Sequence, residues 1–354
     1  MSISVFEHPF LTQLFGDDEE ILSLFTAAAD IAEMLRYEAA LAEAQADLGL
    51  IPTEAGLAIA QTIETFEPNL SSLAKATARD GVVIPSLVKE LKLAVGKNYG
   101  EYVHFGATSQ DVIDTSLVLR LKRTSTILHA RVQQLVQRYE WLEVTFGTNA
   151  LTGYTRMQAA LPITVSDRIS SWKNPLCSYG TKLNATSFPV QFGGAAGTLE
   201  KFGTQAPALR ALLAEKLELH DSLQWHSQRA FIVEFGNLLS LVTGTLGKFG
   251  QDIALMAEMG EELSLTGGGG SSAMPHKQNP VGAEMLISLA RFNAAQMGGL
   301  HQAMVHEQER SGAAWMVEWM VLPQIVASTG SALNIASALI DKIVRIGTEH
   351  TPDT

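Results

Sequence analysis

The 354-residue sequence predicts an all-α fold, in which a small N-terminal helical domain precedes a bundle of five long helices. Long stretches place apolar residues at intervals of three and four, which is the period of an amphipathic helix. No stretch shows the sustained alternation of apolar and polar residues expected of a strand. Hydrophobic residues make up 46% of the chain and charged residues only 18%, against an average of about 25%. This composition indicates that part of the surface is buried against other subunits.

The N-terminal domain is expected over residues 1–103. A helix of roughly 20 residues should end at Gly49 and Pro52, because glycine terminates helices and proline cannot continue them. A less regular helical hairpin follows over residues 54–97 and is interrupted near Gly81. The spacing that predicts the first helix is that of Leu35, Ala39, Ala42 and Ala46.

The central bundle is expected over residues 104–345, followed by a short tail over 346–354. Its first helix should begin after Thr108, because Thr108 and Asp111 have the spacing of a capping box. Neither glycine nor proline interrupts the pattern until Gly147, which predicts a helix far longer than the average of about 12 residues. Its apolar stripe consists of Ile113, Leu117, Leu121, Leu128, Val132, Leu135 and Leu142. The other four long helices are predicted over residues 162–186, 228–259, 279–305 and 315–344.

Several of these helices are apolar on more than one face. In the first long helix, the residues off the main stripe are Val112, Val118, Leu119 and Ile127. A helix that is apolar on two faces must be covered on both. We therefore expect the bundles of several subunits to pack together.

Charge and cysteine content exclude several classes of function. A net charge of −12 argues against a nucleic-acid partner, because neutralising phosphates requires clustered lysine and arginine. The single cysteine, Cys177, excludes a disulfide framework and is expected to be a small buried hydrophobe. The N-terminus has no basic region followed by an apolar run, and no run of about 18 uninterrupted apolar residues occurs. These features predict a soluble, cytoplasmic protein without a membrane partner.

The segment "GGGGSSAMPHKQNP", residues 267–280, separates two apolar helical stretches. It combines hydroxyl groups at Ser271 and Ser272 with a cation at Lys277 and an amide at Asn279. Pro280 is suited to the first turn of the next helix, and a helix N-terminus attracts anions. We interpret the segment, with its flanks at 265–280, as a loop that binds a carboxylate rather than as a flexible linker.

Four segments resemble the site segments of the fumarase, aspartase and argininosuccinate lyase superfamily. They are "GSSAMPHKQNP" (270–280), "HFGATSQDVIDT" (104–115), "GYTRMQAALPIT" (153–164) and "QFGGAAGTL" (191–199). Within that superfamily the chain is most similar to the bacterial 3-carboxy-cis,cis-muconate cycloisomerases. The resemblance implies an all-helical homotetramer that needs no cofactor or metal, acts on a small dicarboxylate or tricarboxylate, and shares its sites between subunits. Because relatives usually continue into a third helical domain, the C-terminal domain is expected to be truncated here.

The resemblance also implies roles for individual residues. Ser271 would move a proton at the carbon next to a carboxylate, and Lys277 and Asn279 would hold that carboxylate. Arg310 would clamp a further carboxylate, because a guanidinium matches its geometry with two parallel bonds. The remaining substrate-binding residues implied are His104, Thr108, Ser109, Gln110, Arg156, Gln158, Ser272 and Met274.

One departure from the superfamily pattern favours the lactone-forming branch. Arg156 stands where fumarases and adenylosuccinate lyases have a histidine, and Ala159 stands where some cycloisomerases have one. An amine or hydroxide leaving group needs such an acid, whereas a carboxylate with a solution pKa near about 4 leaves readily as an anion. The sequence therefore predicts conversion of 3-carboxymuconate, or an analogue with another anionic group such as a sulfonate, to a lactone.

Alternatives stay open at this point. The chain could be another lyase of the superfamily, such as an adenylosuccinate lyase, or a non-catalytic oligomeric protein on the same scaffold. Arg79 suits a carboxylate-binding role and a surface role equally. The spacing of His301 and His306 could suggest metal ligands, although no cysteine or second cluster supports them. The residues expected to be structural are His276, Trp315 and Trp319.

Overall fold

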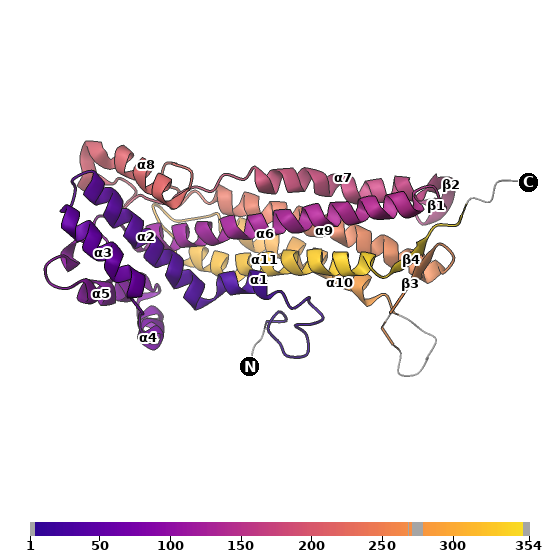
Figure 1. Ribbon diagram of the computed structural model, residues 1–354, viewed down its shortest axis with the longest axis horizontal. Coiled ribbons are helices and arrows are strands. Elements are labelled where there is room, and N and C mark those ends of the chain that lie inside the picture. The colour runs from indigo at the N-terminus through magenta and orange to yellow at the C-terminus, as the bar shows by residue number, and fades with distance from the viewer. Residues whose placement is uncertain (1–3, 268, 271–278, 350–354) are drawn as a thin grey trace, which may run out of the picture.

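The computed structural model describes residues 4–267, 269–270 and 279–349. It is an elongated helical molecule whose long helices run parallel to its long axis (Figure 1). The predicted all-α class and the five long helices are confirmed. These helices are α6 (Ser109–Phe146), α7 (Val165–Asn184), α9 (Ala230–Met259), α10 (Val281–Gln302) and α11 (Gly312–Ile340).

Short helices gather at one end of the bundle, around the first part of α6 (Figure 1). The helix predicted before Gly49 is α2, and the predicted hairpin over 54–97 contains three helices rather than two. The break expected at Gly81 is confirmed, because Gly81 has φ +76° and caps α4. The other helical elements of the described residues are α1 (Glu19–Leu22), η1 (Ser23–Phe25), α2 (Ala27–Asp47), α3 (Thr53–Thr65), α4 (Leu70–Asp80), α5 (Ile84–Val95), η2 (Gly100–Tyr102), η3 (Glu200–Gln205) and α8 (Ala206–Leu217).

The predicted start and buried face of α6 are both confirmed. Thr108 and Asp111 form the capping box, and the chain leaves the helix at Gly147. All seven residues of the predicted stripe are buried, as are the off-stripe residues Val112, Val118 and Leu119, whereas Ile127 is half-buried. These faces belong to two hydrophobic clusters. One runs along the bundle, and the other contains residues of helices α2, α3, α4, α5 and α8 together with the start of α6. The start of α6 is therefore held rigidly between the two clusters.

Helix α9 is long and rich in apolar residues. By length and composition it could cross a membrane, since its 18-residue window has a mean hydropathy of 1.4. However, 56% of that window is buried inside the molecule, and the core residues Leu239, Leu246 and Phe249 are fully covered. Its apolar composition is thus that of the central helix of a bundle.

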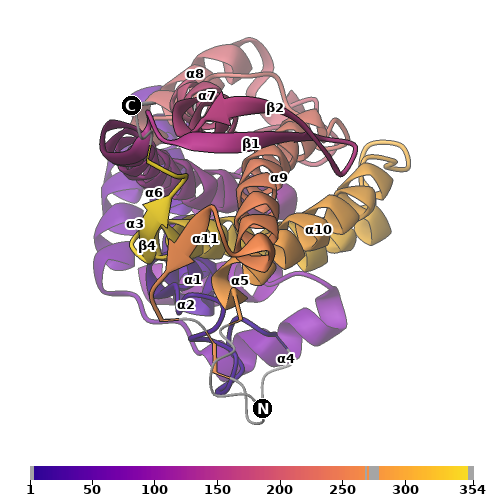
Figure 2. The same cartoon turned by 90° about the vertical axis from the view of Figure 1, so that its right-hand side faces the viewer.

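Two small antiparallel strand pairs correct the prediction that the chain contains no strand. Strands β1 (Ala150–Thr155) and β2 (Gln158–Thr164) form a hairpin, and β3 (Leu263–Leu265) pairs with β4 (Ile343–Ile346). Both pairs lie at the end of the bundle away from α2 to α5 (Figure 2). The hairpin was missed because its turn residues, Arg156 and Met157, are unusual. Both have positive φ, at 49° and 65°, where asparagine and glycine are the typical residues.

Cys177 is exposed, so the prediction that it is a buried hydrophobe is wrong. It lies on α7, whose buried face is formed by Ile169, Trp172 and Leu176. Residue 177 follows that face by one position, which on a helix is a rotation of about 100° and turns its thiol outward.

Candidate functional site

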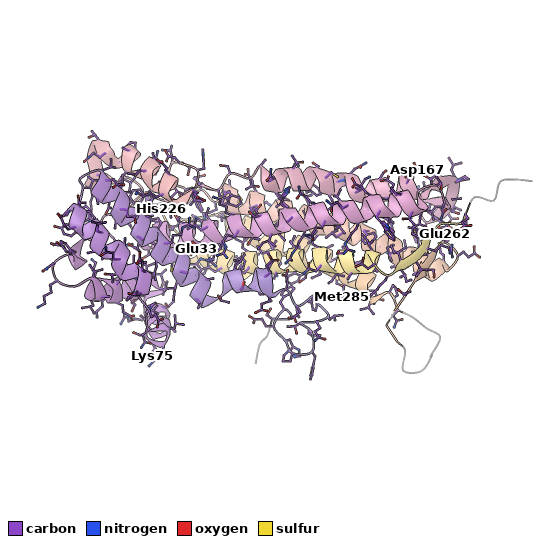
Figure 3. The ribbon with its side chains drawn as sticks, in the orientation of Figure 1. Glu33, Lys75, Asp167, His226, Glu262 and Met285 are labelled. Carbon is purple, nitrogen blue, oxygen red and sulfur yellow. The ribbon has the colours of Figure 1, made fainter. Side chains whose placement is uncertain are left out.

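The N-terminus of α6 joins two of the segments singled out in the sequence. The Asp111 carboxylate accepts hydrogen bonds from the backbone N–H of Thr108 (3.0 Å), Gly193 (2.8 Å) and Gly194 (3.0 Å). His226 Nε2 lies 2.7 Å from Asp111 Oδ1, and both side chains are buried. The segment 191–199 is thereby fixed against the start of α6. His226 lies at the same end of the bundle as α2 to α5 (Figure 3).

Gln110 connects this end of α6 to Arg310. Its side chain is completely buried, and its amide nitrogen donates to the carbonyl oxygen of His226 at 2.9 Å. Its amide oxygen accepts from Nε of Arg310 at 2.9 Å, and Nη2 of Arg310 donates to the carbonyl oxygen of Ala195 at 3.2 Å. Gln110 therefore holds the guanidinium by one edge. Among the described residues, no hydrogen bond is recorded for Nη1, so the exposed end of the guanidinium, formed by Nη1 and the second proton of Nη2, can donate to an anion.

A buried ionic cluster lies one turn further along α6. Arg229 donates to both oxygens of Asp114, at 2.7 and 3.0 Å, and to both oxygens of Glu318, at 2.7 and 2.6 Å. Trp315 Nε1 also donates to Asp114, at 3.0 Å. Burial lowers the pKa of Arg229, but the two carboxylates outweigh it and the net pKa is raised. Burial raises the pKa of Glu318 despite the arginine. This cluster ties α6, α9 and α11 together beneath Gln110.

The segment that precedes α6 carries His104, whose backbone has φ +61°. Its Nδ1 lies 2.6 Å from Oε1 of Glu38 on α2, and the carbonyl oxygen of the next residue accepts from Gln45 Nε2 at 2.7 Å. Gly106 has φ +74°, and a Cβ placed there would lie 2.2 Å from the ring of Phe202. This part of the predicted site is therefore anchored to the short helices.

Arg156 and Gln158 lie in the β1–β2 hairpin, at the other end of the bundle. Both are exposed, and Arg156 is in the strained turn described above. The hairpin is attached to the bundle by Glu262, whose Oε1 accepts from the backbone N–H of Thr152 at 2.7 Å. Asp167 caps the helix that follows the hairpin, and Figure 3 shows both acidic residues at this end.

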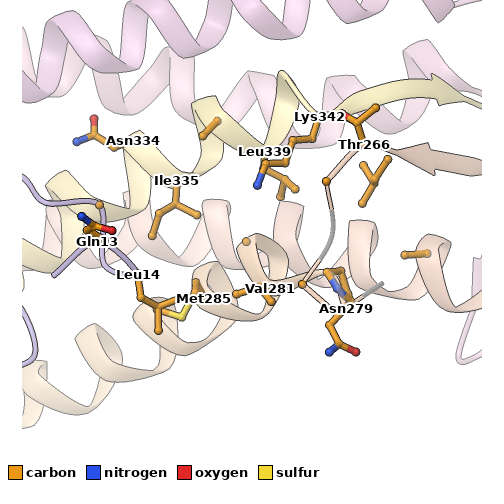
Figure 4. A pocket seen from close by; sticks show the side chains of 18 of the residues that line it. Gln13, Leu14, Thr266, Asn279, Val281, Met285, Asn334, Ile335, Leu339 and Lys342 are labelled. Carbon is orange, nitrogen blue, oxygen red and sulfur yellow. The ribbon is translucent and has the colours of Figure 1, made fainter. Parts of the chain in front are cut away.

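The base of the 265–280 loop is closed by a backbone bridge. Gly269 N–H donates to the carbonyl oxygen of Asn279 at 3.0 Å, and Asn279 N–H donates to that of Gly269 at 2.9 Å. A Cβ on Gly269 would lie 2.7 Å from Val281, so only glycine fits beside the start of α10. Asn279 and Gly269 border a cavity of about 660 Å³ between α10, α11 and Leu14 (Figure 4). The predicted residues outside the described ones are Ser271, Ser272, Met274, His276 and Lys277.

Comparison with known proteins identifies the family. A family model described as lyase matches residues 17–292, which is well over half of the chain. The chain belongs to this lyase family. This lyase-family chain is 37% identical over 331 residues to the 3-carboxy-cis,cis-muconate cycloisomerase of Pseudomonas putida, an alignment that covers 90% of the chain and 78% of the relative. It is 38% identical over 332 residues to the enzyme of the same name from Pseudomonas aeruginosa, covering 90% and 72%.

A solved structure agrees with the sequence matches. The crystal structure of the 3-carboxy-cis,cis-muconate lactonizing enzyme from Pseudomonas putida superposes with a TM-score of 0.85 at 35% identity. The superposition covers 92% of this chain and 75% of that chain. Together these matches confirm the superfamily resemblance seen in the sequence, and they show that this lyase-family chain is an enzyme.

Among the remaining candidates, Trp315 belongs to the buried cluster beneath Gln110 through its hydrogen bond to Asp114. Arg79 is exposed and donates to its neighbour Asp80 at 2.7 Å. His301 is exposed, whereas Nδ1 of His306 accepts from the backbone N–H of Ser311 at 3.4 Å. Within the described ranges, no three His, Cys, Asp or Glu side chains are grouped as metal ligands would be. Trp315 is buried and packs on Trp319, with ring centroids 4.8 Å apart.

Proposed function

We propose that this chain is a cofactor-independent cycloisomerase. It would convert 3-carboxy-cis,cis-muconate, or a close analogue with another anionic substituent, to the corresponding muconolactone. The observation that carries the proposal is the similarity to muconate cycloisomerases over about nine-tenths of the chain, in both sequence and structure. The activity of another lyase of the family has less support as an alternative, because the relatives at 37% and 38% identity share the cycloisomerase name.

The reaction needs a carboxylate to add to a conjugated double bond. Electron density then collects on the neighbouring carboxylate as an enediolate, and a proton is added to the adjacent carbon. Lys277 and Asn279 would stabilise the enediolate, and each fixed donor of this kind contributes about 2.7–4 kcal/mol. The bridge between Gly269 and Asn279 supports this role, because it fixes the backbone from which the Asn279 amide projects. Ser271 would deliver the proton.

The opposite end of the bundle would bind the other anionic groups. Thr108 and Ser109 lie at the N-terminus of α6, where the helix dipole favours a negative charge. The free end of the Arg310 guanidinium can bind a carboxylate or a sulfonate through two parallel hydrogen bonds. Gln110 then acts through Arg310, because both ends of its amide are already hydrogen-bonded within the protein.

These groups are too far apart to act together within one chain. Helix α6 has 38 residues and α10 has 22, which at about 1.5 Å per residue correspond to roughly 57 Å and 33 Å. The α6 N-terminus therefore lies far from both the hairpin and the start of α10, which follows Asn279 (Figure 1). We propose that each site is completed by other copies in a homotetramer. The exposed apolar residues of the hairpin, Tyr154, Met157 and Leu161, support this proposal, because an isolated two-stranded hairpin is marginally stable.

The experiment that tests the function is a substrate panel with the purified protein. Lactonisation removes a conjugated double bond, so the ultraviolet absorbance of 3-carboxy-cis,cis-muconate should fall and lactone should appear. The same panel includes the sulfonate analogue, adenylosuccinate and argininosuccinate. Fumarate released from either of the last two, without turnover of the muconates, would contradict the cycloisomerase. Inactivity on every compound would also contradict the proposed function.

A further inference from the structure

Glu38 is a buried carboxylate in direct contact with a predicted substrate-binding residue. It lies on α2 with 1% of its side chain exposed, and its Oε1 is 2.6 Å from Nδ1 of His104. Its second oxygen, Oε2, is buried and has no hydrogen-bond partner among the described residues. A carboxylate in such a place costs free energy unless a positive charge compensates for it. The His104 ring is the group in position to supply that charge.

The hydrogen bond to Glu38 also decides what the rest of the His104 ring can do. A carboxylate accepts, so Nδ1 must carry a proton whether the ring is neutral or charged. If the ring is neutral, Nε2 presents a lone pair, which repels a substrate carboxylate. If the ring is an imidazolium, Nε2 carries a proton and can donate to that carboxylate. The charge state of His104 therefore switches Nε2 between repelling and binding an anion.

The charged groups around His104 favour the imidazolium. Burial lowers the pKa of His104, but the charge of Glu38, its hydrogen bond and the charge of Asp111 on α6 outweigh this, and the net pKa is raised. Lys92 on α5 acts in the opposite direction. Tyr37, which neighbours Glu38 on α2, is fully buried, and burial together with the charges of Asp111 and Glu38 raises its pKa, so it remains neutral.

The backbone supports the same arrangement. His104 has φ +61°, a strained conformation for a residue with a side chain. It is held there by contacts on both sides, the Glu38 bond and the bond from Gln45 to the next carbonyl group. These contacts fix the orientation of the His104 ring. The ring lies on the segment that leads into Ser109 and the N-terminus of α6.

We propose that Glu38 is a positioning residue that keeps His104 protonated, so that Nε2–H of His104 donates to a carboxylate of the substrate. Only the identity of that carboxylate rests on the proposed function. If the pair were purely structural, it would anchor residue 104 to α2, and substrate binding would not depend on the charge of the His104 ring.

Glu38→Gln separates these two readings, because glutamine keeps a hydrogen-bond acceptor but removes the charge. In the wild-type enzyme the imidazolium persists above the ordinary histidine pKa of about 6.5 and is lost as pH rises through the raised pKa. In the pH range between the ordinary and the raised pKa of His104, we expect kcat/KM of Glu38→Gln to fall about 10- to 100-fold, mainly through KM. The alkaline decline of the profile should also begin at lower pH. Glu33→Gln is the matched control, since Glu33 is also a buried α2 carboxylate, one that pairs with Arg36 and Arg123.

NMR titration of the histidine ring nitrogens tests the charge state without any substrate. The His104 signals, assigned with His104→Gln, should titrate above about 6.5 in the wild-type protein and at lower pH in Glu38→Gln. A wild-type midpoint at or below 6.5 would overturn the proposal, even if Glu38→Gln did not fold. An unchanged KM in a folded Glu38→Gln would also overturn it. Protein with the expected titration but no activity on any muconate would instead contradict the proposed function and leave the pairing intact.

Discussion

Replacing Ser271 with alanine is expected to lower kcat on 3-carboxymuconate by about 10²–10⁴-fold, the range typical of losing a proton-transfer group. The reason is that no other hydroxyl in the proposed mechanism delivers the proton to the carbon beside the enediolate. The fold should be unaffected, because the change removes one oxygen atom and leaves both hydrophobic clusters intact. Initial rates and thermal unfolding followed by circular dichroism measure the two effects separately.

The control for Ser271→Ala is Ser288→Ala. Ser288 is an exposed residue of α10 whose hydroxyl donates to the carbonyl oxygen of Glu284 at 2.9 Å. Its loss should leave both rate and melting temperature close to those of the wild type. If Ser271→Ala kept a wild-type rate, the serine would not be the proton carrier.

Arg229→Met is expected to lower the free energy of unfolding by about 3–5 kcal/mol. Methionine fills much of the same volume but leaves the carboxylates of Asp114 and Glu318 facing each other in a fully buried place. When one partner of a buried ionic cluster is removed, the remaining charges are no longer compensated, and their desolvation free energy destabilises the fold. Urea unfolding followed by circular dichroism at a fixed protein concentration gives the change directly.

Arg310→Met provides the comparison for this prediction. Arg310 is exposed and has no buried charge as a partner among the described residues, so its replacement should lower stability by only about 1 kcal/mol, through the lost bond to Gln110, while weakening substrate binding. Equal urea midpoints for wild type and Arg229→Met would show that the cluster contributes nothing to stability. The account of how α6, α9 and α11 are held together would then be wrong.

Most of the helices could be predicted from the sequence because each buries a face with a clear period. The stripe from Ile113 to Leu142 and the capping box at Thr108 predicted where α6 begins, how long it is and which of its faces is buried. The β1–β2 hairpin could not be predicted in the same way. Strand β2 is exposed over most of its length and contains Pro162, so it shows no alternation of buried and exposed residues. Its turn lacks the asparagine and glycine that normally mark one.

The site was predictable only as separate segments. Family resemblance pointed to Arg310 and Gln110, but only the structure shows that the first is held by the second. Glu38 was missed, although a signal exists. It falls on the buried face of α2, three residues after Leu35, and a charged residue on an apolar face requires a partner. That partner, His104, lies 66 positions away, and sequence spacing cannot reveal such a contact.

The most direct test of the shared site is complementation between two inactive variants. Ser271→Ala alters the loop and Arg310→Met alters the opposite end of the bundle, so in the proposed oligomer the two changes affect different subunits of one site. After the variants are dissociated and reassembled at equal concentrations, random mixing should leave roughly a quarter of the sites with both segments intact. Activity at low substrate should then rise to about that fraction of the wild-type value. A mixture in which subunit exchange is verified but activity stays at the level of the separate variants would contradict a site built from several copies.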